Sequence, residues 1–389
     1  MKIKLILSIF LSLLLFSCQE PIIDDPNKEE PDVEKPKPPV VNPEKPDDPD
    51  EPASTSLAFV KGMGVGWNLG NTLDTKNSDK TYWGNPETTR ELIDAVKAKG
   101  FKTLRVPITW QFNMSMTAPD YTIQSTYLDR VEEIVNYGLR NDMYVIVNIH
   151  HDEDIISPTY AKYDQSEAIL KSIWTQVATR FKEYDNKLIF ENFNEMRVVG
   201  SAQEWNGGTE ENRDCINKFH AAIVKAVRAV GGKNTDRYLM VAPYAASTAP
   251  VAIDALVLPK DDHLIVAVHS YSPYNFAMNA NGTASWGTSQ EKRELDAEMD
   301  KIYNKFIARN IAVVMGEWGS INKNNVDARI AHASYYVSAC RRRGICPVWW
   351  DNGVARKANG KVADTYGLIN RSTYRWEHDS LASAIVDAQ

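Results

Sequence analysis

Short apolar runs rich in β-branched residues alternate with longer amphipathic stretches from Ser54 to the C-terminus. Each short run has the length of one buried strand, and each longer stretch repeats its apolar residues at helical spacing. Strands are therefore expected at 64–67, 103–108, 144–150, 188–194, 238–242, 264–269, 311–316 and 345–350. Helices are expected between them at 86–99, 126–140, 166–183, 212–230, 290–309 and 326–343, with only a short helical segment at 252–256 after the fifth strand.

Eight strand–helix units follow one another without a change in composition, and this order predicts an α/β fold, a single (β/α)₈ barrel. Pro86 near the start of the first helix and Gly100 after its end are typical helix boundaries. A doubly wound open sheet is the competing fold. It is disfavoured because the glycines at 62–66 lie within the first predicted strand and do not form a phosphate-binding turn before a helix.

The start of the chain has the pattern of an export signal. Lys2 and Lys4 precede an apolar run at 5–16, which is shorter than the roughly 20 residues that a membrane-spanning helix needs. The run leads to Cys18 in a sequence that resembles a bacterial lipobox. We expect residues 1–17 to be a lipoprotein signal peptide and Cys18 to carry a lipid, which anchors the exported protein to the bacterial envelope at the outer membrane and cell surface.

Residues 18–53 differ in composition from the rest of the chain. Positions 19–53 hold 10 of the 19 prolines, 12 acidic residues, 4 lysines and no aromatic residue. Such a segment cannot bury enough apolar surface to offset the entropy of ordering, so a disordered Pro/Asp/Glu-rich tether is expected before one folded domain at 54–389.

Most of the negative charge belongs to the tether. It carries −8 against a net charge of −7, and the first eighteen residues carry +2, which leaves −1 for residues 54–389. A nearly neutral domain argues against a nucleic-acid partner and suits an uncharged substrate. We expect the domain to be a monomer that meets the membrane only through the lipid on Cys18.

The domain has three cysteines, Cys215, Cys340 and Cys346. An odd number leaves at least one free thiol, and the pairing of the others stays open. Without a CxxC spacing they do not indicate a metal site, and buried small apolar side chains are the expected role.

Seven of the eight predicted strands end in polar or aromatic residues, and the fifth is the exception. These ends lie at 67–74, 105–107, 148–152, 194–195, 269–271, 316–318 and 349–352. The carboxyl ends of the strands of a (β/α)₈ barrel meet at one mouth, where the active sites of this fold lie. Polar residues from seven strands would not stabilise a core, so we expect them to form a site.

Two of these strand ends carry a glutamate, Glu195 after the fourth strand and Glu317 after the seventh. Two carboxyl groups facing each other across a sugar are the minimum equipment for hydrolysing a glycosidic bond, and a retaining mechanism places them about 5–5.5 Å apart. We expect Arg105 and the hydroxyl of Tyr271 to keep Glu317 ionised. Burial and the charge of Glu317 are expected to raise the pKa of Glu195 and keep it protonated.

Several strand ends carry a family resemblance. Residues 67–74 (Trp-Asn-Leu-Gly-Asn-Thr-Leu-Asp), the pair His150-His151, residues 193–195 (Phe-Asn-Glu), residues 269–271 (His-Ser-Tyr) and the pair Gly316-Glu317 together resemble the family 5 glycoside hydrolases. The first motif and the histidine pair are most similar to the branch of endo-β-1,4-glucanases, lichenases and xyloglucanases. The resemblance covers residues 57–389 and implies a (β/α)₈ fold and a retaining mechanism.

The resemblance also implies roles for single residues. Glu195 corresponds to the acid/base and Glu317 to the nucleophile. The candidate substrate-binding residues are Asn68, Arg105, His150, His151, Asn194, His269, Tyr271 and Trp350. Met196 and Trp318 depart from the Pro and Phe that the family often has, but neither is a reacting group.

The pair His150-His151 also raises the question of a metal site. Adjacent residues of a strand point to opposite sides, so one ion would not be bound by both, and no HExxH helix accompanies them. We therefore expect neither a metal nor a cofactor. His150 is expected to contact substrate, and His151 to orient a neighbouring carboxylate or backbone group.

The tryptophans are candidates for stacking against pyranose rings. Trp350, at the end of the eighth strand, is the candidate floor for the reacting sugar, and further subsites are expected at Trp83, Trp110, Trp205 and Trp286. Trp67 and Trp349 are expected to pack inside the barrel.

The sequence thus predicts a cellulase-like retaining endo-β-1,4-glucanase that cuts internal bonds of plant β-glucans. It does not separate cellulose-type glucan, mixed-linkage glucan and xyloglucan, so a xyloglucan-specific enzyme is one alternative. A non-catalytic surface glycan-binding lipoprotein is the alternative from another class, but it would not need two carboxylates together with Arg105 and the histidines. An esterase is disfavoured because the chain lacks a Gly-x-Ser-x-Gly elbow.

Overall fold

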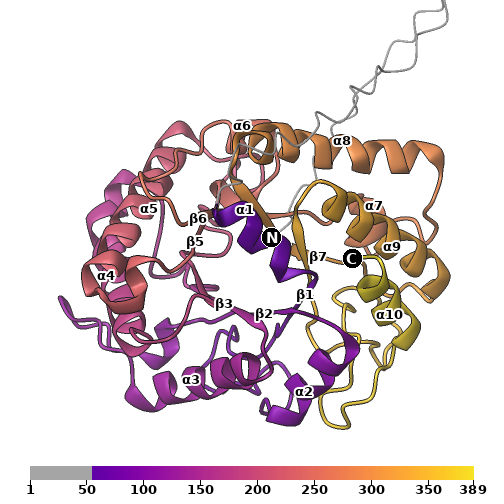
Figure 1. The fold of residues 1–389 in the computed structure, drawn as a ribbon, viewed down its shortest axis with the longest axis horizontal. Coiled ribbons are helices and arrows are strands. Elements are labelled where there is room, and N and C mark those ends of the chain that lie inside the picture. Colours follow the sequence, from indigo (N-terminus) through magenta and orange to yellow (C-terminus); the bar gives the residue numbers. More distant parts are fainter. Residues whose placement is uncertain (1–54) are drawn as a thin grey trace, which may run out of the picture. The chain divides into compact units, whose positions relative to one another are not determined.

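Eight parallel strands form a closed barrel in the computed structural model, which describes residues 55–389 (Figure 1). The strands are β1 (Gly66–Asn68), β2 (Thr103–Val106), β3 (Tyr144–Asn148), β4 (Leu188–Glu191), β5 (Leu239–Val241), β6 (Leu264–His269), β7 (Ala312–Trp318) and β8 (Cys346–Trp349). Each strand pairs with the next along the chain, and β8 pairs with β1. The single (β/α)₈ barrel expected from the sequence is confirmed.

Most of the helices surround the barrel, between the strands that they connect (Figure 1). The α-helices are α1 (Thr55–Met63), α2 (Arg90–Lys99), α3 (Ser125–Arg140), α4 (Tyr163–Arg180), α5 (Glu210–Val230), α6 (Pro250–Ile253), α7 (Tyr274–Ala277), α8 (Ser289–Lys305), α9 (Val326–Arg342) and α10 (Asp379–Asp387). Short 3₁₀ turns are η1 (Gln111–Asn113), η2 (Tyr160–Lys162), η3 (Gly232–Thr235), η4 (Tyr244–Ala246) and η5 (Ile307–Arg309). The short α6 after β5 is the brief helical segment that the sequence indicates there.

The first predicted helix begins later than expected. α2 starts at Arg90 and not at Pro86, because the hydroxyl of Thr89 caps it by accepting a hydrogen bond from the backbone N–H of Leu92. Gly100 ends the helix in the left-handed conformation, with φ of 116°, as expected of a C-terminal glycine.

The sequence reading missed α1, which lies across the amino-terminal end of the barrel (Figure 1). Its Val60 and Met63 are fully buried and join the inward-pointing strand residues, such as Ile146 and Val348, in one apolar cluster. The hydroxyl of Thr103, at the start of β2, donates a 2.7 Å hydrogen bond to the carbonyl of Met63. α1 therefore closes this end of the barrel and leaves the carboxyl end of the strands for the site.

A larger apolar core lies between the strands and the helices, and it contains Trp67 and Trp349, both fully buried. The expectation that these two pack inside the barrel is wrong. Val348 belongs to the cluster inside the barrel, and an added Cβ at Gly66 would touch its side chain. Because successive side chains of a strand point to opposite faces, the neighbouring tryptophans face the helices.

The three cysteines of the domain are free and buried, so the disulfide that the sequence left open is not formed. None of the helices within residues 55–389 combines the length and the apolar character that crossing a membrane requires. The predicted signal peptide at 1–17, the lipid site at Cys18 and the tether at 18–53 lie outside the described residues.

Candidate active site

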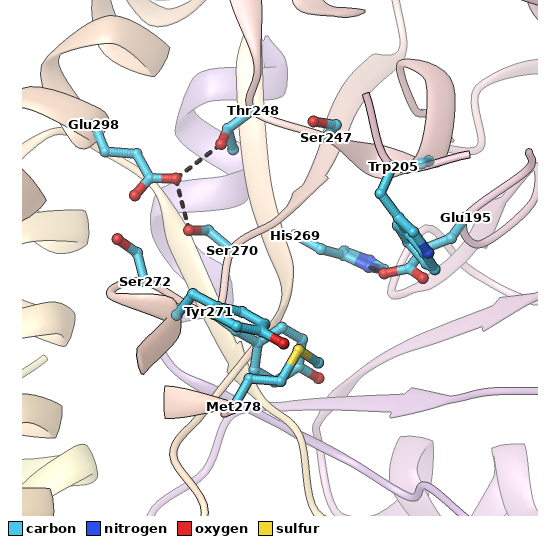
Figure 2. Close-up of a pocket in the computed structure, with 12 residues that line it drawn as sticks. Glu195, Trp205, Ser247, Thr248, His269, Ser270, Tyr271, Ser272, Met278 and Glu298 are labelled. Carbon is cyan, nitrogen blue, oxygen red and sulfur yellow. Dashed lines mark hydrogen bonds and ion pairs between the residues drawn. The ribbon is translucent and has the colours of Figure 1, made fainter. Parts of the chain in front are cut away.

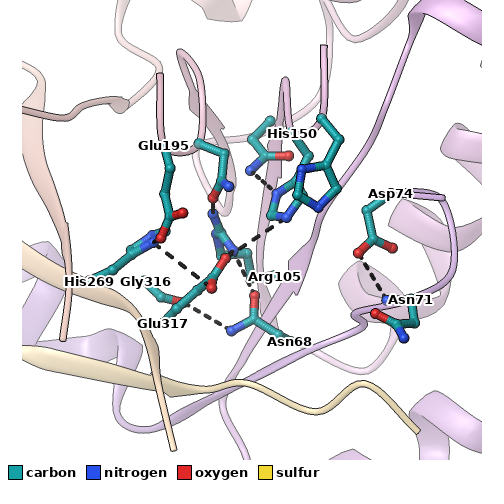
Figure 3. Close-up of polar contacts among 12 residues, drawn as sticks. Asn68, Asn71, Asp74, Arg105, His150, Glu195, His269, Gly316 and Glu317 are labelled. Carbon is teal, nitrogen blue, oxygen red and sulfur yellow. Dashed lines mark hydrogen bonds and ion pairs between the residues drawn. The ribbon is translucent and has the colours of Figure 1, made fainter. Parts of the chain in front are cut away.

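The polar strand ends meet at the carboxyl end of the barrel, where Figure 3 shows Glu195, His269, Glu317, Arg105 and His150 around one centre. Three of these residues lie within strands β2, β6 and β7, and the other two lie in the segments just after β3, which ends at Asn148, and β4, which ends at Glu191. Short connections to the strands hold the side chains on the rigid part of the fold.

Glu317 reaches this mouth through an irregularity in β7. Ala312 and Val314 point into the barrel, so strict alternation would turn Glu317 toward the helices. The pairing of β7 with its neighbours shifts register between Met315 and Trp318. Such a shift re-aims the side chains that follow it, and Glu317 lies in the mouth with 8% of its side chain exposed.

The carboxyl groups of Glu195 and Glu317 face each other across the mouth. One carboxylate oxygen of each, together with a ring nitrogen of His269, lies within 4.8 Å of the others. Retaining glycosidases place their two carboxyl groups about 5–5.5 Å apart, and inverting ones about 6.5–9.5 Å apart. The observed separation fits the retaining arrangement.

Arg105 and Tyr271 both donate to Glu317. The distances are 2.9 Å from Arg105 Nη1 to Oε1 and 3.0 Å from the Tyr271 hydroxyl to Oε2. Burial and the charge of Glu317 raise the pKa of Tyr271 well above its usual value, so its hydroxyl stays a donor. Burial works to lower the pKa of Arg105, but the charges of Glu191 and Glu317 raise it above the usual value. Both partners of Glu317 are the ones that the sequence led us to expect.

Asn68 and Asn194 fix the guanidinium group of Arg105. Their side-chain oxygens accept from Nη1 at 2.9 Å and from Nη2 at 2.8 Å. Asn68 and Arg105 are both fully buried. Their predicted contact with substrate is therefore a correction: they lie beneath the cleft and act on a ligand only through Glu317 and Asn194.

His269 is the partner of Glu195. Its Nδ1 lies 2.9 Å from Glu195 Oε1 and 3.9 Å from Glu317 Oε2. Burial raises the pKa of Glu195, but the hydrogen bond and charge of His269, with Arg197 and His151 further away, outweigh burial and lower it. The expected rise in this pKa is thus wrong for the free protein, because the sequence could not show His269 against the carboxyl group.

The two histidines after β3 have different environments. Burial, and then the charge of His151, lower the pKa of His150 well below its usual value, so His150 is neutral. The amide of Asn148 lies 3.2 Å from Nδ1 of His150, whose Nε2 lies 4.0 Å from Glu317 Oε1. His151 contacts Glu153 through Nδ1 at 3.3 Å, in line with its predicted role of orienting a carboxylate.

Asp74, His150 and His151 place donor atoms within 4.8 Å of one another, as a metal site would. The side-chain oxygen of Asn148 accepts from the backbone N–H of Ile108, which turns its amide N–H toward His150 Nδ1. His150 Nδ1 is thereby an acceptor, and its Nε2 carries the proton. Since Nδ1 is engaged and Nε2 has no free lone pair, the chemistry of this set does not fit a metal ion.

Trp350 forms one wall of the site. Its ring is parallel to that of His150, with an interplanar angle of 1° and 5.8 Å between the centroids. An added Cβ at Gly70 would lie 2.7 Å from the Trp350 ring, so the glycine of the 67–74 motif makes room for it. Trp350 is half-buried, which leaves part of the ring open to a ligand.

A pocket of about 820 Å³ opens on the other side, beside Glu195 and His269 (Figure 2). Trp205, 58% exposed, lines it together with Tyr271, Ser270 and Glu298. The ring of Trp205 lies 4.5 Å from the guanidinium carbon of Arg197. Ion pairs of 3.0 Å with Glu153 and 3.1 Å with Glu204 hold Arg197 in place.

The other predicted subsite tryptophans have different roles. Trp110 is 1% exposed and donates to the carbonyl of Asn148, and Trp286 is buried against His332. Both are corrections, because a tryptophan in a loop can pack as well as bind. Trp83 is half-buried and lies edge-on to His151 with 6.0 Å between the ring centroids, so it remains a candidate.

Three charged residues of the site were missed from the sequence. Glu191 is fully buried against Arg105, and Asp74 accepts the backbone N–H groups of Asn71 and Thr72. Arg197 supports Trp205. The signal for Glu191 was present, because a carboxylate inside an apolar strand needs a partner.

A (β/α)₈ barrel whose mouth holds two glutamates at this separation defines the class of protein, a glycoside hydrolase. The chain belongs to the cellulase family, glycosyl hydrolase family 5, whose family model matches residues 61–356. The resemblance of the strand-end motifs to this family is thereby confirmed.

Known proteins extend this assignment. The cellulase/esterase CelE of Acetivibrio thermocellus is 47% identical over 333 residues, which cover 85% of this chain and 40% of that protein. A GH5-4 broad specificity endoglucanase from Clostridium acetobutylicum is 47% identical with a TM-score of 0.83, and the match covers 85% of this chain and 99% of that one. The protein in the structure of ZgEngAGH5_4 in complex with a cellotriose is 50% identical to this chain. Its TM-score is 0.81, and the match covers 85% of this chain and 98% of that one.

Proposed function

We propose that this chain is a retaining endo-β-1,4-glucanase that hydrolyses internal bonds of plant β-glucans. The observation that carries the proposal is the pair of carboxyl groups, Glu195 and Glu317, within 4.8 Å across the barrel mouth. The similarity to a cellulase/esterase and to a broad specificity endoglucanase supports the substrate class.

In the first step the Glu317 carboxylate attacks the anomeric carbon and forms a glycosyl ester. The bond from that carbon to the aglycone oxygen breaks, and its electron pair stays on the oxygen, which takes a proton from Glu195. Arg105 and Tyr271 keep Glu317 in line for the attack. Asn194 turns its oxygen to Arg105, so its amide N–H is the group that can donate to the 2-hydroxyl of the reacting sugar.

In the second step a water molecule attacks the same carbon. Glu195, now a carboxylate, takes a proton from the water, and the ester bond to Glu317 breaks to release the sugar with its original anomeric configuration. Glu317 loses its negative charge in the first step and regains it in the second. The protonation of Glu195 changes in the same two steps, so the two carboxyl groups are coupled.

The proton for the first step is held by the pair Glu195–His269. Burial works to lower the pKa of His269, but the charge of Glu317 and the contact with Glu195 raise it above 6.5. The raised pKa of His269 and the lowered pKa of Glu195 favour one proton shared by the pair, on either side of a 2.9 Å hydrogen bond. A glycosidic oxygen at Glu195 draws that proton from the pair.

The two sides of the site bind different parts of the glucan. Trp350 and His150 border the reacting sugar next to Glu317, and the pocket lined by Trp205 takes the sugars of the aglycone because it adjoins the proton donor. The aglycone pocket, of about 820 Å³, is open enough for a linear glucan or a xyloglucan backbone. A xyloglucan-specific enzyme is the second candidate, because Trp205 is 58% exposed and a glucan stacked on it would keep one side open to solvent.

The location of the protein is a separate part of the proposal. The sequence at 1–18 supports export and lipid attachment at Cys18, with 18–53 as a tether that carries a monomeric domain away from the outer membrane. Replacing Cys18 with Ala should move the protein from the membrane fraction to the soluble fraction. Retention of the C18A variant in the membrane would contradict lipid anchoring, and sedimentation of the purified domain as a dimer would contradict the monomer.

The function is tested on a panel of soluble cellulose derivative, mixed-linkage glucan, xyloglucan and mannan, with sizing of the products. We expect a rapid fall in polymer length on β-1,4-glucans and products of retained configuration by NMR. Glu195→Ala and Glu317→Ala should each lose activity by about a hundredfold or more. Undiminished hydrolysis by Glu195→Ala would reject its role, and an inverted product would reject the mechanism.

A further inference from the structure

Glu191 is a buried carboxylate that the two catalytic steps do not use. It is the last residue of β4, and neither it nor Arg105 has any exposed side-chain surface. Arg105 Nε donates to Glu191 Oε2 at 2.7 Å, and Nη2 donates to Oε1 at 3.1 Å. The amide of Asn148 adds a third donor at 3.2 Å. A site this dry holds a charged pair only with such complete hydrogen bonding.

The guanidinium group of Arg105 is fully engaged. Its five N–H groups make five hydrogen bonds: two to Glu191, one to Glu317, one to Asn68 and one to Asn194. One positive charge therefore faces two carboxylates at the same time. Glu191 takes the two-bond contact, and Glu317 takes a single bond from Nη1.

This division matters because Glu317 must both give up and regain its charge. A carboxylate that Arg105 stabilised by its whole charge would be a weaker nucleophile and a better leaving group. Without Arg105, the carboxylate would be a stronger nucleophile but a poorer leaving group. The two steps respond in opposite directions to the same change in electrostatic stabilisation.

We propose that Glu191 is a positioning residue that sets the reactivity of Glu317 by taking up part of the charge of Arg105. This inference rests on the proposed function of Glu317 as the nucleophile. Glu191 makes no contact with Glu195 or with the carboxyl group of Glu317, and its two-bond contact with the shared guanidinium group is the route by which it acts on Glu317.

Replacing Glu191 with Gln removes the competing charge and keeps the shape. We expect formation of the glycosyl ester to slow about tenfold and its hydrolysis to speed up about tenfold. Removing a unit charge from a dry site changes the electrostatic stabilisation of a neighbouring carboxylate enough to alter each rate by at least about tenfold. A purely structural role would slow both steps together. The opposite signs are therefore the signature of the proposal.

The two steps are measured separately with 2-deoxy-2-fluoro-β-cellobiosyl fluoride, which traps the ester on the enzyme. The rate of inactivation reports ester formation, and the rate of reactivation after excess probe is removed reports hydrolysis. Mass spectrometry of peptides identifies the labelled residue. Thermal unfolding of each variant shows that it is folded.

Two variants complete the experiment. Glu191→Asp keeps the charge, so its ratio of the two rates should return toward that of the unsubstituted protein. Asp351→Asn is the matched control, because Asp351 is also a fully buried carboxylate paired with an arginine, Arg371 at 3.3 Å, but it does not contact Arg105. It should leave the ratio unchanged.

The outcomes separate the inference from the function on which it rests. Parallel changes of both rates in Glu191→Gln, or no change, with labelling still at Glu317, would overturn the role of Glu191 alone. Failure of the unsubstituted protein to form an ester at Glu317 would overturn the proposed function first. An Asp351→Asn variant with the same opposed rates would also count against Glu191, because the effect would then follow from any lost buried charge.

Discussion

Glu195 Oε1 and His269 Nδ1 lie 2.9 Å apart, and His269 Nδ1 is also 3.9 Å from Glu317 Oε2. One imidazole thus touches the proposed proton donor and faces the proposed nucleophile. Gly316 allows this placement, since an added Cβ there would lie 2.9 Å from His269 Nε2. In the proposed mechanism the pair Glu195–His269, and not Glu195 alone, is the acid.

The alkaline limb of the pH profile should therefore depend on His269. The pair loses its proton as the pH rises through the pKa of His269, which lies above 6.5. In His269→Gln the proton rests on Glu195 alone, so the alkaline limb of kcat/KM should move to lower pH. An aryl cellobioside with a strongly acidic leaving group needs no proton and serves as the control. An unmoved limb on polymer would contradict the shared proton.

Tyr271→Phe should lower kcat about 10- to 100-fold with little change in KM, because it removes a hydrogen bond to the charged Glu317. Tyr366→Phe is the matched control: its ring lies 5.5 Å from that of Tyr271, but its hydroxyl donates to the carbonyl of Ala277. Steady-state kinetics on mixed-linkage glucan give the answer. Equal effects of the two substitutions would mean that the hydroxyl of Tyr271 has no special role.

Trp205→Ala should raise KM for polymers by roughly tenfold, the loss expected for an aromatic stacking contact. Hydrolysis of an activated aryl cellobioside, which places no sugar in the pocket beside Glu195, should be unchanged. Tyr160→Ala is the control, because Tyr160 is equally exposed but contacts Lys218 away from this pocket. If Trp205→Ala weakens the hydrolysis of polymers and of the aryl cellobioside equally, the pocket is not the aglycone site.

Gly70→Ala should act through Trp350, whose ring would lie 2.7 Å from the new methyl group. We expect weaker binding of oligosaccharides, measured by calorimetry, and little further loss when Trp350→Ala is combined with it. Such non-additivity is the mark of two residues that share one function. Additive losses would show that Gly70 is required for another reason.

Stability should fall as the pH drops below 6.5. Burial lowers the pKa of both His220 and His332 to about 4, so the unfolded chain binds protons that the folded protein does not. Their stabilising effect is complete above 6.5 and is lost between 6.5 and about 4, up to about 3 kcal/mol for each histidine. Urea unfolding of His332→Phe should show a smaller loss between pH 7 and 4.5. The same slope as in the unsubstituted protein would exclude His332 as a source.

The order of strands and helices could be predicted from the sequence because it depends on local patterns of apolar and polar residues. Apolar runs place all eight strands, and helical spacing places the helices between them, with α2 displaced only because Thr89 rather than Pro86 begins it. α1 was missed because its apolar residues pack into the end of a barrel that exists only after the strands have closed.

The sequence by itself also determined which residue types stand at the strand ends, and with them Glu195, Glu317 and their family. Only the tertiary structure decided how these groups act on one another. A register shift in β7 directs Glu317 into the mouth. His269 lies against Glu195 and lowers the pKa of that carboxyl group. Arg105 donates to both Glu191 and Glu317. Periodicity tells which face of its own strand a residue prefers, but the field at a carboxylate comes from charges on other strands, whose distances only the closed barrel fixes.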